Sequence, residues 1–247
     1  MTLNQLFPLE TDPKTGEPFL RLRKHPNVIL TPMRWEDAPH FVPIFNDPRV
    51  YQWLMRTPFP YAHKDAEDWL QIAKPKSDAV LQELLDAQGS DKLKTIDGCP
   101  VPSIREVKED GTQVYIGNIT FGRCMHPELI DTDTIDHEHA EEKKAANDAL
   151  QVGDPKIIYS IGDYLDPKYH GQGIMTDALD TILHEWAIPR MNVRRILTGA
   201  FIGNVGSVRV FQKNGFKMLR TVDEFAVVRG TMRGLHVLEW RADEDPV

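Results

Sequence analysis

The most constraining feature of this sequence is one continuous stretch in which a strand pattern runs into a glycine-rich turn and then into a helix pattern. Residues 157–165 form an apolar run typical of a buried strand. Residues 166–180 follow and contain Gly171 and Gly173. Helical periodicity then places six apolar side chains on one face, namely Ile174, Ala178, Leu179, Ile182, Leu183 and Trp186. The sequence therefore predicts a strand, a glycine turn and a helix in that order.

This order of elements suits the binding of a phosphate group. The first N–H groups of a helix lack intrahelical partners and lie at the positive end of the helix dipole. Glycines let the backbone come close to a bulky anion, because they carry no Cβ. An ordinary turn before a helix is the alternative for so short a pattern. A dinucleotide fingerprint would need glycine in place of Thr176, and the Gly-Lys-Ser/Thr of a P-loop is absent.

Two ordered blocks of the sequence resemble the GNAT superfamily of N-acetyltransferases. The turn reads K-Y-H-G-Q-G from Lys168, against the family pattern [Q/R]-x-x-G-x-[G/A], so Lys168 differs from the usual first residue. Residues 204–216 resemble the second block, N-x-x-S-x-x-V-[LF]-x-K-x-G-F. Residues 34–54 and 66–70 resemble the branch that includes the ribosomal-protein N-terminal acetyltransferases. The resemblance covers most of residues 28–241.

The resemblance implies an α/β fold of the mixed α+β kind, in which a central, mostly antiparallel sheet is splayed at the acyl-CoA site and flanked by helices. It implies acetyl-CoA as the acyl donor, with its pantetheine arm between residues 159–165 and 197–202. The backbone of residues 169–174 would hold the pyrophosphate. The cofactor-binding residues that follow from the resemblance are Tyr164, Leu165, Lys168, Tyr169, His170, Gly171, Gln172, Gly173, Ile174, Asn204 and Lys213.

Acyl transfer from a thioester to an amine also needs a base for the amine and a donor for the departing thiolate. Family members often place a tyrosine in the last conserved block, where this chain has Phe211 and Phe216. Ser207 occupies the serine position of the ribosomal branch, so its hydroxyl either donates to the thiolate or caps a helix. Asp163 is the first choice of base, and Tyr115 or a water held by backbone is the alternative.

The expected function is that of an N-acetyltransferase that passes an acetyl group from acetyl-CoA to a primary amine, either a small molecule or a peptide or protein N-terminus. An α-amine, with a pKa of about 8, requires less help from a base than a lysine at about 10.4. A non-catalytic acyl-CoA sensor on the same fold is the alternative, because a fold does not fix a function. Both a monomer and a homodimer remain open.

Length and composition limit the remaining possibilities. A chain of 247 residues with 41% hydrophobic content fits one enlarged domain over residues 1–247. A net charge of −8 argues against nucleic acid or an anionic membrane as the partner. We expect a cytoplasmic protein, because neither a signal sequence nor an 18-residue apolar run is present. Cys99 and Cys124 are too few for a disulfide framework, and His137 and His139 stand two apart, so no metal site is predicted.

The rest of the chain predicts elements around this centre. Residues 1–18 are typical of a surface arm, and an acidic, solvated insertion occupies about 123–155, with its helix within 128–148. Asp37 and Asp47 are predicted to cap two helices within residues 34–54. Other predicted elements are a hairpin over 19–33, a short helix over 78–87, a hairpin over 103–121, and strands over 194–201, 216–225 and 235–241. Five aromatic residues are expected in the core, with one or two also walling the acceptor pocket: Trp35, Phe41, Phe45, Trp53 and Trp69.

Overall fold

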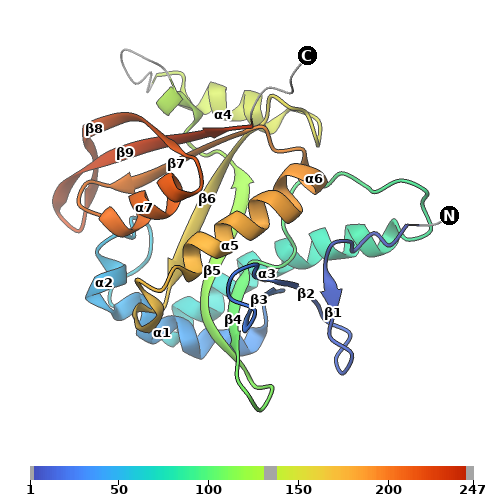
Figure 1. The fold of residues 1–247 in the computed structure, drawn as a ribbon. Coiled ribbons are helices and arrows are strands. Elements are labelled where there is room, and N and C mark those ends of the chain that lie inside the picture. The colour runs from blue at the N-terminus through green and yellow to red at the C-terminus, as the bar shows by residue number, and fades with distance from the viewer. Residues whose placement is uncertain (1–2, 131–137, 243–247) are drawn as a thin grey trace.

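The computed structural model describes residues 3–130 and 138–242, which fold around a single mixed sheet flanked by helices (Figure 1). The strands within these residues are β1 (Glu10–Thr11), β2 (Pro18–Arg21), β3 (Val28–Thr31), β4 (Ser103–Val107), β5 (Gln113–Arg123), β6 (Ile158–Leu165), β7 (Arg195–Phe201), β8 (Lys217–Val228) and β9 (Thr231–Arg241). The helices are α1 (Ala38–Asn46), α2 (Pro48–Tyr51), α3 (His63–Asp86), α4 (Ala140–Asp148), α5 (Ile174–Ile182), α6 (Ile188–Met191) and α7 (Val205–Lys213).

The strands lie in the order β1-β2-β3-β4-β5-β6-β7-β9-β8. Every neighbouring pair is antiparallel except β6 and β7, which run parallel. The parallel pair needs a crossover, and α5 supplies it. The expectation of a mixed, mostly antiparallel sheet between helices is therefore confirmed.

The two faces of the sheet are covered by different helices. In Figure 1, α5 and α7 lie on the near face, while α1 and α3 lie behind the sheet. The apolar face predicted for α5 and the turn after it is confirmed, because all six of its side chains are buried in the core that α5 shares with β6. On the other face, Tyr164 packs against Phe45 and the α1 core. Because successive side chains of β6 point to opposite faces of the sheet, one face of the strand packs on the α5 core and the other on the α1 core.

Both predicted hairpins and the two consecutive helices before residue 54 are confirmed, but their capping differs in part from the expectation. Asp47 caps α2, since its side chain accepts from the Arg49 N–H. Asp37 does not cap α1 with its side chain. Its carboxylate instead binds both the Arg105 guanidinium, at 2.8 Å for each oxygen, and the Arg34 N–H. The Asp37 carboxylate therefore pairs with a buried arginine instead of capping the helix.

The short helix predicted over residues 78–87 is wrong in length, because α3 has 24 residues and ends at Asp86. Pro75 lies inside it, although a proline removes one helical hydrogen bond and usually interrupts a helix. Ala66, Leu70, Ser77 and Leu84 are buried along one side of α3, at spacings that keep them on a common face. Packing of this face against α1 and the two core clusters offsets the local cost of the proline.

The prediction of a surface arm over residues 1–18 is also corrected. Residues 10–11 form β1 and pair with β2, so the sheet begins within the arm. Gln5 is fully buried and its side chain bonds the Lys92 carbonyl and the Lys94 N–H. Leu9 joins the main core. The arm is therefore part of the fold.

The acidic insertion is fixed to the sheet at the end of α4. Asn147 donates to the Ile158 carbonyl at 2.9 Å and accepts from the Ile158 N–H at 2.8 Å, so its amide extends the pairing of β6. Arg123 donates to the carbonyls of Asn147, Asp148 and Leu150 at the end of α4. Residues 131–137, which include His137, lie outside the described residues. The solvated helix expected within the insertion is confirmed, and its end is anchored to the sheet.

No helix within residues 3–130 and 138–242 has the length and apolar character required to cross a bilayer.

The predicted aromatic core is correct for Phe41 and Phe45, which are buried, and wrong for two tryptophans. Trp35 and Trp69 each keep 46% of their surface exposed. Both lie outside the α1 core cluster that holds the two phenylalanines. Sequence periodicity alone did not distinguish the aromatic residues that face the sheet from those that face outward.

The buried pair of Arg105 and Asp37 generates a testable prediction. Arg105→Met leaves the Asp37 carboxylate buried without its cation, so the free energy of unfolding should fall by about 3–5 kcal/mol. Urea denaturation measures this change. Lys64→Met, which breaks the exposed Lys64–Asp68 pair, is the control and should hardly alter the midpoint. An Arg105→Met midpoint equal to that of the wild type would contradict the importance of the pair.

Candidate functional site

The site begins where β6 and β7 part. The two strands pair only at Ile158 with Arg195 and at Tyr159 with Ile196. Beyond these pairs β6 continues to Leu165 along β5, and β7 continues to Phe201 along β9. The predicted splay is therefore confirmed, and it leaves a gap between the two strands at the start of the glycine turn and of α7.

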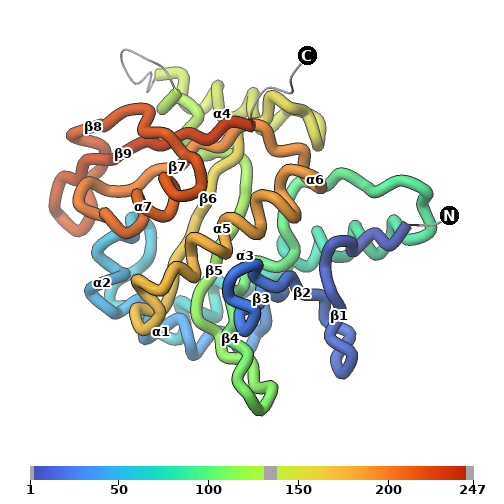
Figure 2. The backbone as a smooth tube through the Cα atoms, viewed as in Figure 1, coloured from blue at the N-terminus to red at the C-terminus, as the bar shows by residue number. Residues whose placement is uncertain are grey.

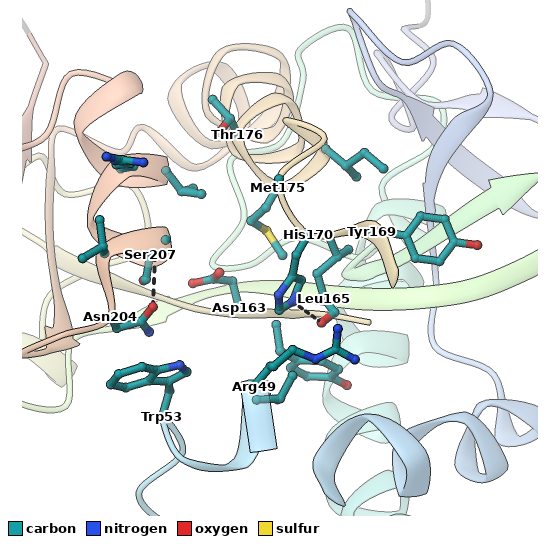
Figure 3. A pocket seen from close by; sticks show the side chains of 18 of the residues that line it. Arg49, Trp53, Asp163, Leu165, Tyr169, His170, Met175, Thr176, Asn204 and Ser207 are labelled. Atoms are coloured by element: carbon teal, nitrogen blue, oxygen red, sulfur yellow. Dashed lines mark hydrogen bonds between the residues drawn. The ribbon is translucent and has the colours of Figure 1, made fainter. Parts of the chain in front are cut away.

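A pocket of about 550 Å³ occupies this gap, a volume in the usual range for small-ligand sites. Four segments line it: α2 with the turn after it, the end of β6, the glycine turn with the start of α5, and the start of α7 (Figure 3). The sequence-predicted residues that it brings together are Asp163, Tyr164, Leu165, Tyr169, His170, Gly171, Gly173, Ile174, Asn204, Ser207 and Lys213.

The glycine turn has the backbone that an anion site requires. Gly171 and Gly173 adopt φ values of +74° and +83°, a backbone region that residues other than glycine rarely occupy. A Cβ built on Gly171 would meet no atom within 4 Å, so that the space in front of the turn is open. Ile174 begins α5 directly after the turn. Free N–H groups at this helix start therefore face a space that a phosphate group can fill.

Neighbouring segments hold the glycine turn in place. The His25 Nε2 contacts the Gln172 carbonyl at 3.1 Å, and its Nδ1 contacts the buried Asp177 carboxylate at 2.7 Å. The Gln172 side chain donates to the Lys168 carbonyl at 2.8 Å. Lys168 and Gln172 do not line the pocket, in contrast to the other residues predicted for this turn. Their contact with a cofactor remains a prediction. In the structure, the hydrogen bond between them stabilises the turn.

Two further residues fix the turn to the sheet. Tyr169 donates its hydroxyl to the Glu106 carboxylate at 2.6 Å, and its ring points away from Asp163 (Figure 3). His170 contacts the Leu165 carbonyl at 2.9 Å through Nε2. Both polar groups are thus occupied by the protein. The residues contribute shape to the pocket and rigidity to the turn.

The start of α7 separates two roles that the sequence left open. Asn204 is the N-cap, because its Oδ1 accepts from the Ser207 N–H at 3.2 Å. The capping side chain is therefore that of Asn204, and the Ser207 hydroxyl is not needed for it. Ser207 lines the pocket from the helix that faces Asp163 (Figure 3). Its role as a donor remains a prediction.

Asp163 is the only acidic side chain among the described residues that line the pocket. It lies on β6 where the strands have parted and has no hydrogen-bond or ion-pair partner within residues 3–130 and 138–242. Burial raises the pKa of Asp163 to about 6 from an ordinary 3.8. A carboxylate with a pKa close to neutral is suited to accept a proton.

Tyr115, the alternative base, lies outside the pocket and is buried. Its hydroxyl is bonded to the Tyr164 hydroxyl at 2.6 Å. Burial raises the pKa of Tyr115 well above 10, which leaves the phenol protonated and unable to act as a base. The geometry favours Asp163.

The wall formed by α2 and the turn after it was predicted only in part, through its aromatic residues. Arg49, Val50, Trp53 and Leu54 line the pocket there. Trp53 lies close to the start of α7, since a Cβ on Gly203 would meet its ring at 3.5 Å. The expectation that an aromatic residue of this region walls the pocket applies to Trp53. Only the fold could identify the other three, because nothing in their spacing distinguishes them from core residues.

The hairpin of β8 and β9 holds this wall from the opposite edge of the sheet. Arg229 stands at its turn with a φ of +50° and donates to the Leu54 carbonyl at 2.6 Å and the Thr57 carbonyl at 3.2 Å. Its guanidinium also lies over the rings of Tyr51 and Phe59, at 5.5 and 5.7 Å. Figure 2 shows the hairpin curving toward α2. Arg229 therefore ties the pocket wall at α2 to the β8–β9 turn.

Metal chemistry has no evident ligand set here. Within the described part of the chain, no group of three or more His, Cys, Asp or Glu side chains is arranged to hold a metal ion.

Comparisons with known proteins agree with this geometry. Residues 27–217 match the family model "Acetyltransferase (GNAT) domain". The probable N-acetyltransferase YjcK of Bacillus subtilis (strain 168) is 39% identical over 56 residues, which are 23% of this chain and 30% of that relative. The matched part thus spans less than a third of this curated relative.

Solved structures show the same fold at low identity. A GNAT-family acetyltransferase from Bacillus anthracis aligns with a TM-score of 0.59 and 13% identity, over 92% of this chain and 99% of that one. The ribosomal α-N-protein acetyltransferase RimL, in complex with coenzyme A, aligns with a TM-score of 0.55 and 14% identity, over 92% and 99%. Because the family model covers most of the sequence and the fold and pocket agree with it, the chain belongs to the GNAT acetyltransferase family.

Proposed function

We propose that this protein is an acetyl-CoA-dependent N-acetyltransferase that acylates a primary amine by direct attack on the thioester. The observation that carries the proposal is the meeting of the glycine turn, Asp163 and Ser207 in one pocket where β6 and β7 part. Acetyl-CoA fits this place, because the open space in front of Gly171 can take the pyrophosphate. The parted strands offer unpaired backbone groups to the pantetheine arm, as in an added strand.

Asp163 serves as the base in this proposal. The amine nitrogen forms a bond to the thioester carbonyl carbon, the carbon–sulfur bond breaks, and the ammonium proton passes to the Asp163 carboxylate and on to solvent. A pKa of about 6 keeps the carboxylate ionised at neutral pH but still basic enough to accept the proton.

Ser207 stabilises the departing sulfur. A serine hydroxyl is a much weaker acid than a thiol, so it donates a hydrogen bond to the developing thiolate and keeps its own proton. The thiolate then takes a proton from solvent. Asn204 maintains the helix start meanwhile, because the cap does not depend on Ser207.

The acceptor class that we favour is an α-amine. Its pKa of about 8 leaves a useful neutral fraction at physiological pH, which a single aspartate can supplement. RimL, one of the structural neighbours, is described as an α-N-protein acetyltransferase. Thiol release from acetyl-CoA, measured with a panel of N-terminal peptides and small amines, tests the proposal directly. Binding of acetyl-CoA without turnover on any acceptor would favour the alternative of an acyl-CoA sensor.

The first prediction from the proposed function concerns cofactor binding by the glycine turn. Gly171→Ala should weaken acetyl-CoA binding about 10-fold or more by calorimetry, because the new Cβ projects into the space for the pyrophosphate. Gly111→Ala is the matched control, since Gly111 also has a positive φ, at +85°, and open space around it, but lies in the β4–β5 turn. It carries the same backbone strain and should bind normally. Equal affinities for the two variants would contradict a phosphate site at Gly171.

The second prediction concerns Asp163 as the base. Asp163→Asn should lower kcat by about 10²-fold, and its residual activity should lose the rise with pH centred near 6.

The same variant should gain stability, with a defined sign. The folded pKa of Asp163 lies above its ordinary 3.8, so wild-type stability falls as pH rises from about 4 to 6, where folding opposes ionisation. Asp163→Asn removes this cost and should raise the free energy of unfolding at pH 7.5 by an amount on the order of 1–2 kcal/mol, an advantage that shrinks toward pH 4.5. A destabilised asparagine variant at pH 7.5 would show that the carboxylate is structural.

The third prediction concerns Ser207. Ser207→Ala should lower kcat by about 10²-fold and leave the KM for acetyl-CoA nearly unchanged, because the hydrogen bond forms as charge develops on sulfur. Its melting temperature should stay close to that of the wild type, since Asn204 provides the cap. Asn204→Ala is the comparison and should lose about 1 kcal/mol of stability. Normal turnover by Ser207→Ala would assign stabilisation of the thiolate to water.

A further inference from the structure

The charges on the wall of the pocket are opposite in sign to those of the whole chain. The chain carries a net charge of −8, yet the basic side chains that line the pocket are Arg49, Arg209 and Lys213, against Asp163 alone. Arg49 is engaged by Asp47 through two hydrogen bonds of 2.9 and 2.7 Å. Arg209 and Lys213 have neither an ion pair nor a hydrogen-bond partner in the described ranges 3–130 and 138–242. Two cations without carboxylate partners in an acidic protein are available to an anionic ligand.

Arg209 and Lys213 share one side of α7. They stand four residues apart on this helix, so their side chains leave the same face. The end of α7 lies against the start of α5, because Asn214 Nδ2 donates to the Thr176 carbonyl at 3.2 Å. Thr176 also lines the pocket. The two cations therefore border the groove between α7 and the glycine turn.

This groove extends away from the reacting groups. Asn204 and Ser207 lie near Asp163 at one end of α7, and Thr176 lies on the neighbouring helix farther from Asp163 (Figure 3). At 1.5 Å per residue, Lys213 stands about 9 Å along the helix from Ser207. A ligand whose thioester lies between Asp163 and Ser207 thus has room to place an anionic group beside Arg209 and Lys213.

Coenzyme A carries two kinds of phosphate, and the pocket offers two kinds of partner. Backbone N–H groups at the glycine turn suit the pyrophosphate, but they bear no formal charge. The 3′-phosphate of the ribose is a monoester that is close to a dianion at neutral pH, and side-chain cations are its usual partners. A pair of free cations at helical spacing matches that requirement, whereas the paired Arg49 does not.

We propose that Arg209 and Lys213 bind the 3′-phosphate of coenzyme A and so make the protein selective for coenzyme A over dephospho-coenzyme A. This inference rests on the proposed acetyl-CoA binding and adds a site for the third phosphate. Arg209 and Lys213 are binding residues that act on affinity, and they take no part in acyl transfer.

Calorimetric titration of the full chain with coenzyme A and with dephospho-coenzyme A tests the proposal. The wild type should bind coenzyme A at least about 10-fold more tightly than dephospho-coenzyme A, because two charge-assisted contacts are lost with the 3′-phosphate. In Arg209→Gln/Lys213→Gln the ratio of the two affinities should fall to about 1, with the affinity for dephospho-coenzyme A within about twofold of the wild type. The preference in the wild type should also weaken at high salt, since the site is open to solvent.

A matched control removes two cations from nearby positions outside the pocket. Lys217→Gln/Arg220→Gln changes the net charge by the same amount at the start of β8, where neither residue lines the pocket. This variant should retain the wild-type preference. Melting temperatures of both double variants establish that they are folded, which is expected because Arg209 and Lys213 are exposed.

Three outcomes would overturn the inference, and they are distinguishable. Equal binding of the two ligands by the wild type would show that the 3′-phosphate is not recognised. Equal weakening of both ligands in Arg209→Gln/Lys213→Gln would assign the cations to the pyrophosphate. Failure of the folded wild type to bind either ligand would contradict the proposed function itself, and the inference with it.

Discussion

Two parallel strands that stay paired over only two residue pairs leave backbone N–H and C=O groups without ladder partners, and buried groups of this kind are costly. In this chain β6 and β7 can part because each is held on its other side, β6 by β5 through Leu165 and β7 by β9 through Phe201. The gap is therefore a stable feature of an otherwise continuous sheet. Everything that defines the pocket, from the glycine turn to the start of α7, follows directly from where these two strands end.

The parted strands also explain why the supporting contacts come from distant parts of the chain. His25 from the β2–β3 turn holds the glycine turn, and Arg229 from the β8–β9 turn holds the segment after α2. Arg105 fixes the start of α1 to the sheet through Asp37. A binding site needs its parts held to within a fraction of an ångström, and loops alone do not provide such rigidity. These three links between distant segments supply it.

The sequence was most informative where local chemistry decides the structure. The strand, the glycine turn and the apolar face of α5 depend on periodicity and on positive φ values at Gly171 and Gly173, and all were predictable. The length of α3 was not, because its continuation through Pro75 depends on tertiary packing. The different places of Trp53, which lines the pocket, and Trp35, which is exposed, were not predictable either, because they depend on how the helices before residue 54 pack. The capping role of Asn204, which leaves the Ser207 hydroxyl out of the helix cap, also required the three-dimensional arrangement.

In the proposed reaction, the distribution of polarity around the pocket bears on the state in which an amine reaches the thioester. The wall from α2 presents Val50, Trp53 and Leu54 beside Arg49, which is paired with Asp47, whereas Arg209 and Lys213 border the groove along α7. An amine that passes the apolar wall loses part of its hydration, which disfavours its charged form and lowers its pKa. The neutral amine is the nucleophile, so this desolvation and the basicity of Asp163 act in the same direction. The proposed mechanism therefore requires a single carboxylate without a cationic partner, because pairing it with an arginine would lower its pKa and weaken it as a base.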